Sequence, residues 1–159
     1  MMWSPLVVLL AIATLAAAER LPDKFFGHFR LDHSENFEEY LTAKGYGWFT
    51  RKLVMFARFD KVFTKATGDK FNMDNLTTKK DVHYRDVVLG KEFTGDGLDS
   101  TNHRVLFYMK GDRLYEKHVV PDPQAREKDE TYAYYFVGDA LVIEMESHGV
   151  VAKRFYKKI

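Results

Sequence analysis

The sequence predicts an antiparallel β fold, either a sandwich or an up-and-down barrel, in which two helices follow the first strand. After Asp60 the chain consists of short runs rich in Val, Thr, Tyr and Phe. Turn sequences such as TGDK, LGKE, TGDG, KGDR and VGDA separate these runs at hairpin spacing. Before Asp60, apolar residues recur at helical spacing instead. Several short strands with tight connections are typical of a sandwich or an up-and-down barrel.

The first strand-like run is KFFGHFRL, residues 24–31. A helix is expected next, because Phe37, Tyr40 and Leu41 fall on one helical face. The two glycines of the following GYG end that helix. Together these features predict one short strand followed directly by an amphipathic helix.

A second helix is predicted from Trp48 to about Phe59, because apolar residues again recur with a helical period. Its basic residues Arg51, Lys52 and Arg58 are typical of a solvated helix face. The two helices read as a helix-turn-helix pair inserted after the first strand.

The remaining chain divides into strands separated by the turn sequences. The predicted strands are Lys61–Lys65, Phe71–Leu76, Val82–Val88, Arg104–Met109, Leu114–Val120, Thr131–Val137, Leu141–Glu146 and Val150–Lys157.

The run ALVIEMES shows which face of its strand is buried. Leu141, Ile143 and Met145 alternate with polar positions, so they share one side of the strand, while Glu144 and Glu146 share the other. This pattern predicts a half-buried strand whose apolar side faces inward.

The last strand carries an arginine on its apolar side. Val150, Ala152, Arg154 and Tyr156 share one face. Either this face turns from core to solvent as the strand ends, or the arginine lies in an apolar interior and binds an anion. Because the inward face of the preceding strand continues through the turn, we expect Arg154 to face inward.

Length and charge restrict the classes of partner. The chain has 159 residues, with 24 Lys and Arg against 23 Asp and Glu. A charge near zero gives no support for a nucleic-acid partner. The chain contains no cysteine, so disulfides cannot hold the fold. We expect one domain, residues 19–159, stabilised by burial and by backbone hydrogen bonds.

Residues 1–18 are expected to be a signal peptide and not part of the fold. An apolar run at residues 7–13 is followed by three alanines at 16–18, and the first charges come at Glu19 and Arg20. The apolar stretch is shorter than the roughly 20 residues of a membrane span, so cleavage is favoured over a retained anchor. We therefore expect a secreted, extracellular protein.

The tripeptide Asn75-Leu76-Thr77 fits the N-glycosylation acceptor pattern. In a secreted protein this pattern predicts a modification site at Asn75, which requires a surface position.

Two segments resemble the intracellular-type fatty acid-binding proteins. GHFRLDHSENFEEYLTAKGYG, residues 27–47, resembles the family's first strand and helix, and Arg154-Phe155-Tyr156 resembles its Arg-x-Tyr carboxylate anchor. The segments YGWFTRK, DNLTTKKDVHYRD and VVPDPQAREKDE are similar to the exported nematode branch. The resemblance covers essentially the whole chain after the expected signal peptide.

The resemblance implies an all-β fold: a flattened ten-stranded antiparallel up-and-down barrel with a helix-turn-helix lid and an internal cavity. It implies that Arg154 and Tyr156 hold a ligand carboxylate. Counting back from Leu141 places Tyr134 where the family often has a second arginine, and a slip of one residue would make it Tyr135. The expected portal and cavity residues are Phe37, Tyr40, Leu41, Leu98, Asp99, Ile143 and Met145.

The function implied is a secreted carrier of long-chain fatty acids. Two alternatives stay open: a retinol carrier, since Tyr134 adds no charge, and a barrel scaffold that binds no ligand. Transient membrane contact through the helical lid is also expected, with Arg51, Lys52 and Arg58 facing anionic lipid. We expect a monomer, because a closed barrel has no free edges.

Enzyme chemistry has no visible signal. The sequence contains no thiol, no Gly-x-Ser-x-Gly elbow and no phosphate-binding loop, so we expect neither an enzyme nor a cofactor. The six histidines lack metal-ligand spacing and are interpreted as solvated imidazoles.

Overall fold

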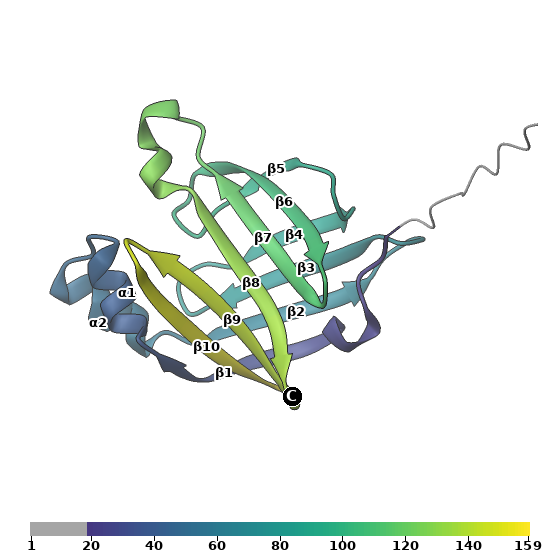
Figure 1. Cartoon of the computed structure of the whole chain (residues 1–159), viewed down its shortest axis with the longest axis horizontal. Helices are drawn as coiled ribbons and strands as arrows, with labels where there is room; N and C mark the ends of the chain where they lie inside the picture. Colours follow the sequence, from purple (N-terminus) through teal and green to yellow (C-terminus); the bar gives the residue numbers. More distant parts are fainter. Residues whose placement is uncertain (1–18) are drawn as a thin grey trace, which may run out of the picture.

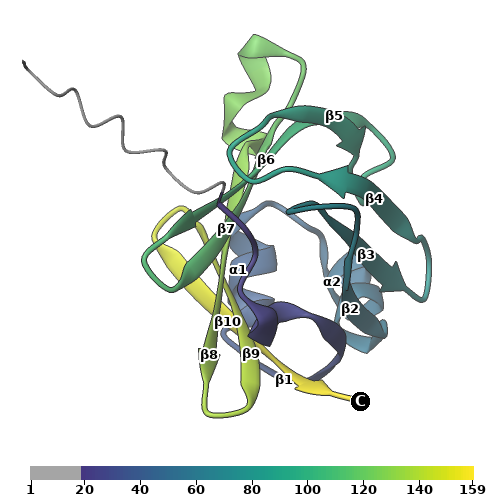
Figure 2. The same ribbon diagram turned by 90° about the vertical axis from the view of Figure 1, so that its right-hand side faces the viewer.

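In the computed structural model, which describes residues 19–159, ten antiparallel strands form one sheet that curls into a barrel (Figures 1 and 2). The strand order is β4-β3-β2-β1-β10-β9-β8-β7-β6-β5, so the first and last strands pair with each other. The strands are β1 Gly27–Glu35, β2 Phe59–Lys65, β3 Phe71–Thr77, β4 Val82–Val87, β5 Phe93–Asp96, β6 Asn102–Lys110, β7 Arg113–Val119, β8 Glu130–Val137, β9 Ala140–Ser147 and β10 Val150–Lys158.

Two helices, α1 (Phe37–Ala43) and α2 (Trp48–Phe56), lie across one end of the barrel after β1 (Figures 1 and 2). The predicted ten-stranded antiparallel barrel with a helical pair after its first strand is thereby confirmed. The expected signal peptide, residues 1–18, lies outside the described residues. Within residues 19–159, no helix is both long and apolar enough to cross a membrane.

The sheet does not close completely, because β4 and β5 are not paired by backbone hydrogen bonds. The Tyr84 hydroxyl of β4 bridges them by donating to the Asp96 carbonyl oxygen of β5 at 2.6 Å. A Cβ atom at Gly95 would lie 2.7 Å from the Tyr84 ring. Glycine at position 95 therefore allows the tyrosine of one edge strand to reach the other.

Several element boundaries differ from the sequence predictions. The predicted second helix continues to Phe59, but α2 ends at Phe56 and Phe59 begins β2. The first strand begins at Gly27, because Asp23–Phe25 form a 3-10 turn, η1. The strand β5 was not predicted: its sequence FTGD is short and half polar. A second 3-10 segment, η2 (Pro123–Lys128), lies in the long loop before β8 (Figure 1).

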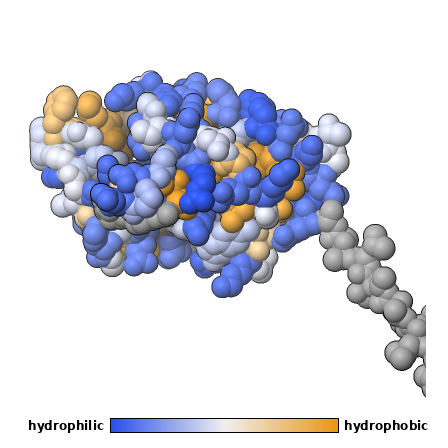
Figure 3. Space-filling model, turned by 90° about the horizontal axis from the view of Figure 1, so that it is seen from above, coloured by the Kyte–Doolittle hydropathy of each residue, from blue (hydrophilic) through white to orange (hydrophobic). Residues whose placement is uncertain are grey.

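The two helices differ in how they contact the barrel. Phe37, Tyr40 and Leu41 of α1 are buried, as the apolar periodicity predicts. None of the residues of α2 is buried. Its apolar side chains contribute to the hydrophobic surface that gathers at the helical end of the molecule in Figure 3. The helix α1 thus belongs to the core, and α2 covers α1 from outside.

The inner face of the sheet is rich in aromatic side chains that pack mostly edge to face. The ring centroid of Phe71 lies 5.5 Å from that of Phe107, and the centroid of Phe63 lies 5.9 Å from that of Tyr134. Ile143 and Met145 of β9 are buried on this face, and Glu144 lies on the outer face, as the alternation predicts. Burial of such rings is the main stabilising contribution to the barrel.

Asn75 does not lie at the surface position that N-glycosylation would require. In β3, Phe71, Met73 and Asn75 are buried in alternation, so Asn75 faces the lumen with 8% of its surface exposed. The local sequence Asn-Leu-Thr does not report which strand face the asparagine occupies. In the folded chain Asn75 is therefore not accessible for N-glycosylation.

Candidate functional site

The side chain of Arg154 lies inside the barrel. It projects inward from β10 with only 4% of its surface exposed. Its Nε donates a hydrogen bond to the Ser34 hydroxyl at 3.1 Å. The guanidinium carbon lies 3.9 Å from the ring centroid of Phe37 and 4.3 Å from that of Phe59. Residues from β1, α1 and β2 therefore hold the guanidinium between two aromatic faces.

This guanidinium forms no ion pair with a carboxylate of residues 19–159. Burial lowers the pKa of Arg154, and Tyr156 opposes that shift. A guanidinium nevertheless stays protonated in proteins, so a positive charge remains in the interior. Burying a charge is costly unless an opposite charge compensates it. The position is suited to binding an anion.

Tyr156 lies two residues further along the inner face of β10 and is buried beside Arg154. Burial raises the pKa of its hydroxyl, and the Arg154 charge opposes that rise. Across the sheet, Arg154 is aligned with Ile143, and Ile143 with Tyr134. The predicted anchor residues Arg154, Tyr156 and Tyr134 therefore share the lumenal face of β8 and β10, with β9 between them.

The tyrosine that faces inward from β8 is Tyr134. Tyr135 lies on the outer face, where its hydroxyl donates to Glu144 at 2.9 Å. The Tyr134 hydroxyl is already engaged, because it donates to Glu116. Its role as a ligand donor stays a prediction, and a ligand carboxylate would compete with Glu116 for it.

A second polar cluster lies in the lumen around Glu116 of β7, which is 3% exposed. One carboxylate oxygen accepts from Tyr134, and the other lies 2.6 Å from Nε2 of His118. Nδ1 of His118 lies 3.0 Å from Nδ1 of His103. Nε2 of His103 in turn lies 3.1 Å from Asp99 at the β5–β6 turn. A chain of polar side chains thus runs from the rim of the barrel into its interior.

Lys61 of β2 adds a second cation to the lumen, with 7% of its surface exposed. Its Nζ lies 5.7 Å from the ring centroid of Tyr134. Burial lowers the pKa of Lys61, the Glu116 charge opposes this, and the Arg154 charge lowers it further. Burial by itself raises the pKa of Glu116, but Lys61 and the hydrogen bonds from His118 and Tyr134 together lower it to about 2. The Glu116 carboxylate therefore compensates the charge of Lys61. The positive charge of Arg154 has no such carboxylate in residues 19–159 to compensate it.

Sequence reasoning missed this second cluster. His103 and His118 were interpreted as solvated imidazoles, and both are buried. A signal was present in the alternation of β7, where Leu114, Glu116 and His118 share one face. Polar residues at inward positions of a strand indicate either a misplaced register or a functional interior.

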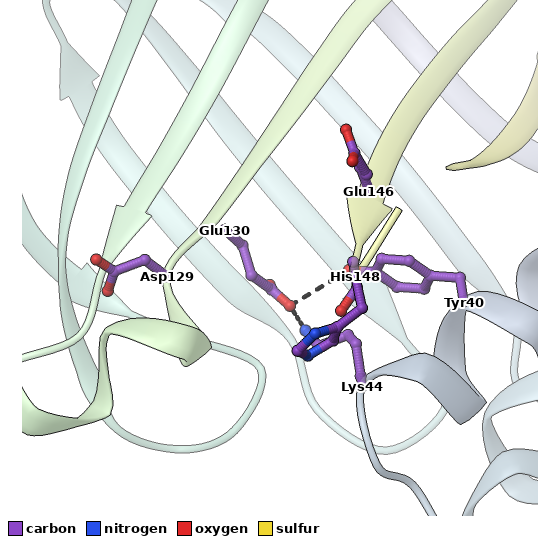
Figure 4. Close-up of a pocket in the computed structure, with 7 residues that line it drawn as sticks. Tyr40, Lys44, Asp129, Glu130, Glu146 and His148 are labelled. Atoms are coloured by element: carbon purple, nitrogen blue, oxygen red, sulfur yellow. Dashed lines mark hydrogen bonds and ion pairs between the residues drawn. The ribbon is translucent and has the colours of Figure 1, made fainter. Parts of the chain in front are cut away.

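The lid helix α1 is attached to the barrel by buried polar contacts. At its C-terminal end, the Lys44 ammonium forms an ion pair with Glu130 of β8, and the Tyr40 hydroxyl donates to Glu130 at 3.3 Å (Figure 4). Burial raises the pKa of Glu130 to about 7 and lowers the pKa of Lys44 to about 8. A pocket of about 200 Å³ lies here, lined by Tyr40, Lys44, Asp129, Glu130, Glu146, Ser147 and His148 (Figure 4).

The expected portal residues gather at this end of the barrel. Leu98 is exposed at the β5–β6 turn. Burial lowers the pKa of Lys44, and the charge of Asp99 opposes this. Phe37, Tyr40 and Leu41 of α1 lie at the same end. Their role in ligand passage stays a prediction.

Two surface pockets are described within residues 19–159. The first lies below α1, and the second, of about 150 Å³, is lined by residues of the N-terminal segment and the β2–β3 turn. Neither lies in the lumen, so the expected internal cavity stays a prediction. On the lumenal wall, the rings of Phe71 and Phe107 and those of Phe63 and Tyr134 pack edge to face.

The chain closely resembles known proteins over nearly its full length. Fatty acid-binding protein homolog 2 of Caenorhabditis elegans is 55% identical over 161 residues, which cover 99% of each chain. The solved structure of As-p18, an extracellular fatty acid binding protein, is 45% identical, with a TM-score of 0.84 over 89% of this chain and 100% of that one. Retinol-binding protein 1 of Mus musculus is more distant, at 30% identity over 87% of this chain and 99% of its own. No protein-family model matches the chain.

The fold is a ten-stranded antiparallel barrel covered at one end by two helices, with a buried arginine on its inner wall. The chain belongs to the fatty acid-binding protein family, as its identity to the nematode relative shows over its whole length.

Proposed function

We propose that this protein is a secreted carrier that binds long-chain fatty acids inside its barrel. The observation that carries the proposal is the buried Arg154 guanidinium, which no carboxylate of the described chain compensates. A fatty acid supplies one carboxylate for this charge. Its acyl chain supplies affinity of about 0.8 kcal/mol for each methylene that leaves water.

The charges of the lumen support a carboxylate head group. Lys61 and Glu116 compensate each other, so the excess charge of Arg154 favours an anion over a neutral alcohol such as retinol. A guanidinium can bind both carboxylate oxygens, and the nearby Tyr156 hydroxyl can donate as well. The names of the relatives support the same ligand class.

Retinol remains the second candidate ligand, because Retinol-binding protein 1 matches most of this chain. Tyr134 is neutral, and its hydroxyl is bonded to Glu116. A retinol hydroxyl would leave Arg154 uncompensated, which is the reason to place it second. A scaffold that binds no ligand would keep the Arg154 charge buried and uncompensated, and no bound anion would offset this cost.

The proposal also includes secretion of the protein and transfer of its ligand at membranes. The signal-like leader and the similarity to an extracellular protein support export of a monomeric carrier. Contact with membranes would use α2, whose side chains Trp48, Phe49, Leu53 and Phe56 are exposed. Of the basic residues expected to face lipid, Lys52 is bonded to Glu38 at 2.9 Å and Arg51 lies 3.7 Å from the same carboxylate. The apolar face of α2 is thus the stronger candidate for contact.

The test is displacement of a fluorescent fatty acid from delipidated mature protein, with retinol titrated in parallel. Arg154→Met should weaken binding of oleate by tens-fold, because the carboxylate loses its charge partner. Retinol binding should change little. The control is Lys153→Met, which removes a cation from the outer face of the same strand.

Saturable binding of oleate that Arg154→Met leaves unchanged would contradict the anchor. If the unmodified protein bound neither ligand, the scaffold alternative would replace the carrier. Equal loss of both ligands in a variant with an unchanged circular dichroism spectrum would favour a neutral role for Arg154.

A further inference from the structure

A lumenal amide has an unsatisfied hydrogen-bonding atom. Asn75 is more than nine-tenths buried and faces inward from β3. Its Oδ1 has no hydrogen-bond partner. An acceptor that is buried without a donor destabilises the folded state, and native proteins keep few such atoms. A donor on a bound molecule would satisfy it.

A cation lies directly beside this amide. Lys61 of β2 is the antiparallel partner of Asn75 in the ladder, and both side chains face inward. Directly opposed residues have Cβ atoms about 5 Å apart. Lys61 forms no direct ion pair with a carboxylate in the described part of the chain, and Glu116 compensates its charge from a distance. A lysine and an amide acceptor therefore project from opposed positions of two adjacent strands into the lumen.

This region is close to the proposed carboxylate anchor. The Arg154 guanidinium stacks on the ring of Phe59, and Phe59 precedes Lys61 by two residues on β2. Two residues along a strand span about 7 Å, and residues two apart share a face. A ligand whose carboxylate lies at Arg154 would therefore pass the Lys61 and Asn75 pair with carbons further along its chain.

We propose that Asn75 and Lys61 form a second polar subsite, which binds a hydroxyl group part-way along the acyl chain of a fatty acid. Hydroxylated fatty acids are then the preferred ligands. The inference rests on the proposed function, since it requires the carboxylate at Arg154.

A hydroxyl matches both groups of the subsite. Its O–H donates to Oδ1 of Asn75, and its oxygen accepts from the Lys61 ammonium. Because a hydroxyl both donates and accepts, it also satisfies the amide if its oxygen and nitrogen are exchanged. An unsubstituted acyl chain would leave the amide unsatisfied and place methylenes against an ammonium. A keto group could only accept, so it should gain less.

The experiment compares stearate with a series of monohydroxystearates that differ in hydroxyl position, using displacement from the delipidated protein. At least one mid-chain isomer should bind about five- to tenfold more tightly than stearate. The isomer with its hydroxyl next to the carboxylate should show no gain, because that hydroxyl lies at Arg154. The matching keto acid should fall between the best isomer and stearate.

Two substitutions test whether the preference for a hydroxylated isomer arises at Asn75 and Lys61. Asn75→Leu and Lys61→Met should each remove most of the preference for the hydroxylated isomer. Stearate binding shows whether each variant is folded, and Asn75→Leu should bind stearate at least as well as the unmodified protein. The control is Asn102→Leu, which removes an exposed amide at the start of β6 and should keep the preference.

If stearate binds but no isomer binds more tightly, the inference is overturned. A preference that survives Asn75→Leu would also overturn it. If stearate itself does not bind, both the proposed function and this inference fail, so the two failures are distinguishable.

Discussion

Arg154 and Glu116 are both buried charges on the inner wall of the barrel, but their surroundings are opposite. Glu116 accepts hydrogen bonds from Tyr134 and His118, and the Lys61 charge lies nearby. Arg154 has one hydroxyl and two aromatic faces, with no carboxylate partner in the described chain.

If Arg154 binds a ligand as proposed, the difference distinguishes a charge that stabilises the fold from a charge that binds an anion. A buried charge whose partners are all within the protein contributes to the folded state and strongly destabilises it when one partner is removed. A buried charge without a charged partner destabilises the ligand-free protein. When a ligand of opposite charge binds, it compensates that buried charge. Structural and binding roles can therefore be told apart by the sign of a substitution's effect on stability.

The largest loss of stability is expected on substitution of Glu116. Glu116→Ala leaves Lys61 buried without a compensating charge and removes the acceptor of Tyr134, so the free energy of unfolding should fall by about 3–5 kcal/mol. Urea unfolding of the delipidated protein measures this change. A loss below about 1 kcal/mol would show that Glu116 is not a structural charge.

The same carboxyl group should contribute to acid unfolding. Its pKa is about 2 in the folded chain against an ordinary value of 4.5. A carboxyl group with a lowered pKa stabilises the fold above its ordinary value, and this contribution, about 3 kcal/mol, is lost as the pH falls from about 4.5 towards 2. Glu116→Gln should flatten the dependence of stability on pH in that interval. An unchanged slope would contradict the coupling.

The opposite change in the free energy of unfolding is expected at Arg154. Arg154→Met replaces an uncompensated charge by an apolar side chain of similar length, so the delipidated protein should gain about 1–2 kcal/mol of stability while losing fatty acid affinity. Thermal unfolding with and without oleate measures both effects. The neighbouring outward substitution Lys153→Met should change stability by less than about 0.5 kcal/mol. A strong destabilisation by Arg154→Met would mean that the guanidinium is a structural element.

Most of the fold could be predicted from the sequence, because turn residues and alternation are local signals. The inward position of Arg154 followed from strand alternation alone, and the register of β9 and β10 confirms it. The end of α2 could not be predicted in the same way. The strand β2 begins at Phe59, and its next residue, Asp60, is the ladder partner of Arg30 of β1 and accepts hydrogen bonds from it, a contact between residues far apart in the sequence.

The candidate site was only half predictable. Arg154 and Tyr156 could be predicted from the family resemblance and from their shared strand face. Glu116, Lys61 and Asn75 instead come from three separate strands. The curl of the sheet into a barrel places them on one inner wall, and no spacing along the chain encodes this arrangement. The inward alternation of polar residues in β7 was the one local sign, and its meaning depends on strand neighbours that the sequence does not name.

If the chain is exported as proposed, the inward position of Asn75 also constrains how it matures. The acceptor tripeptide is accessible only until β3 pairs with β2, and an oligosaccharide attached there would be too large for the barrel to close around it. Hairpins of this kind form within microseconds. In a secreted chain, pairing of β2 with β3 before a glycosylating enzyme acts would therefore leave Asn75 unmodified.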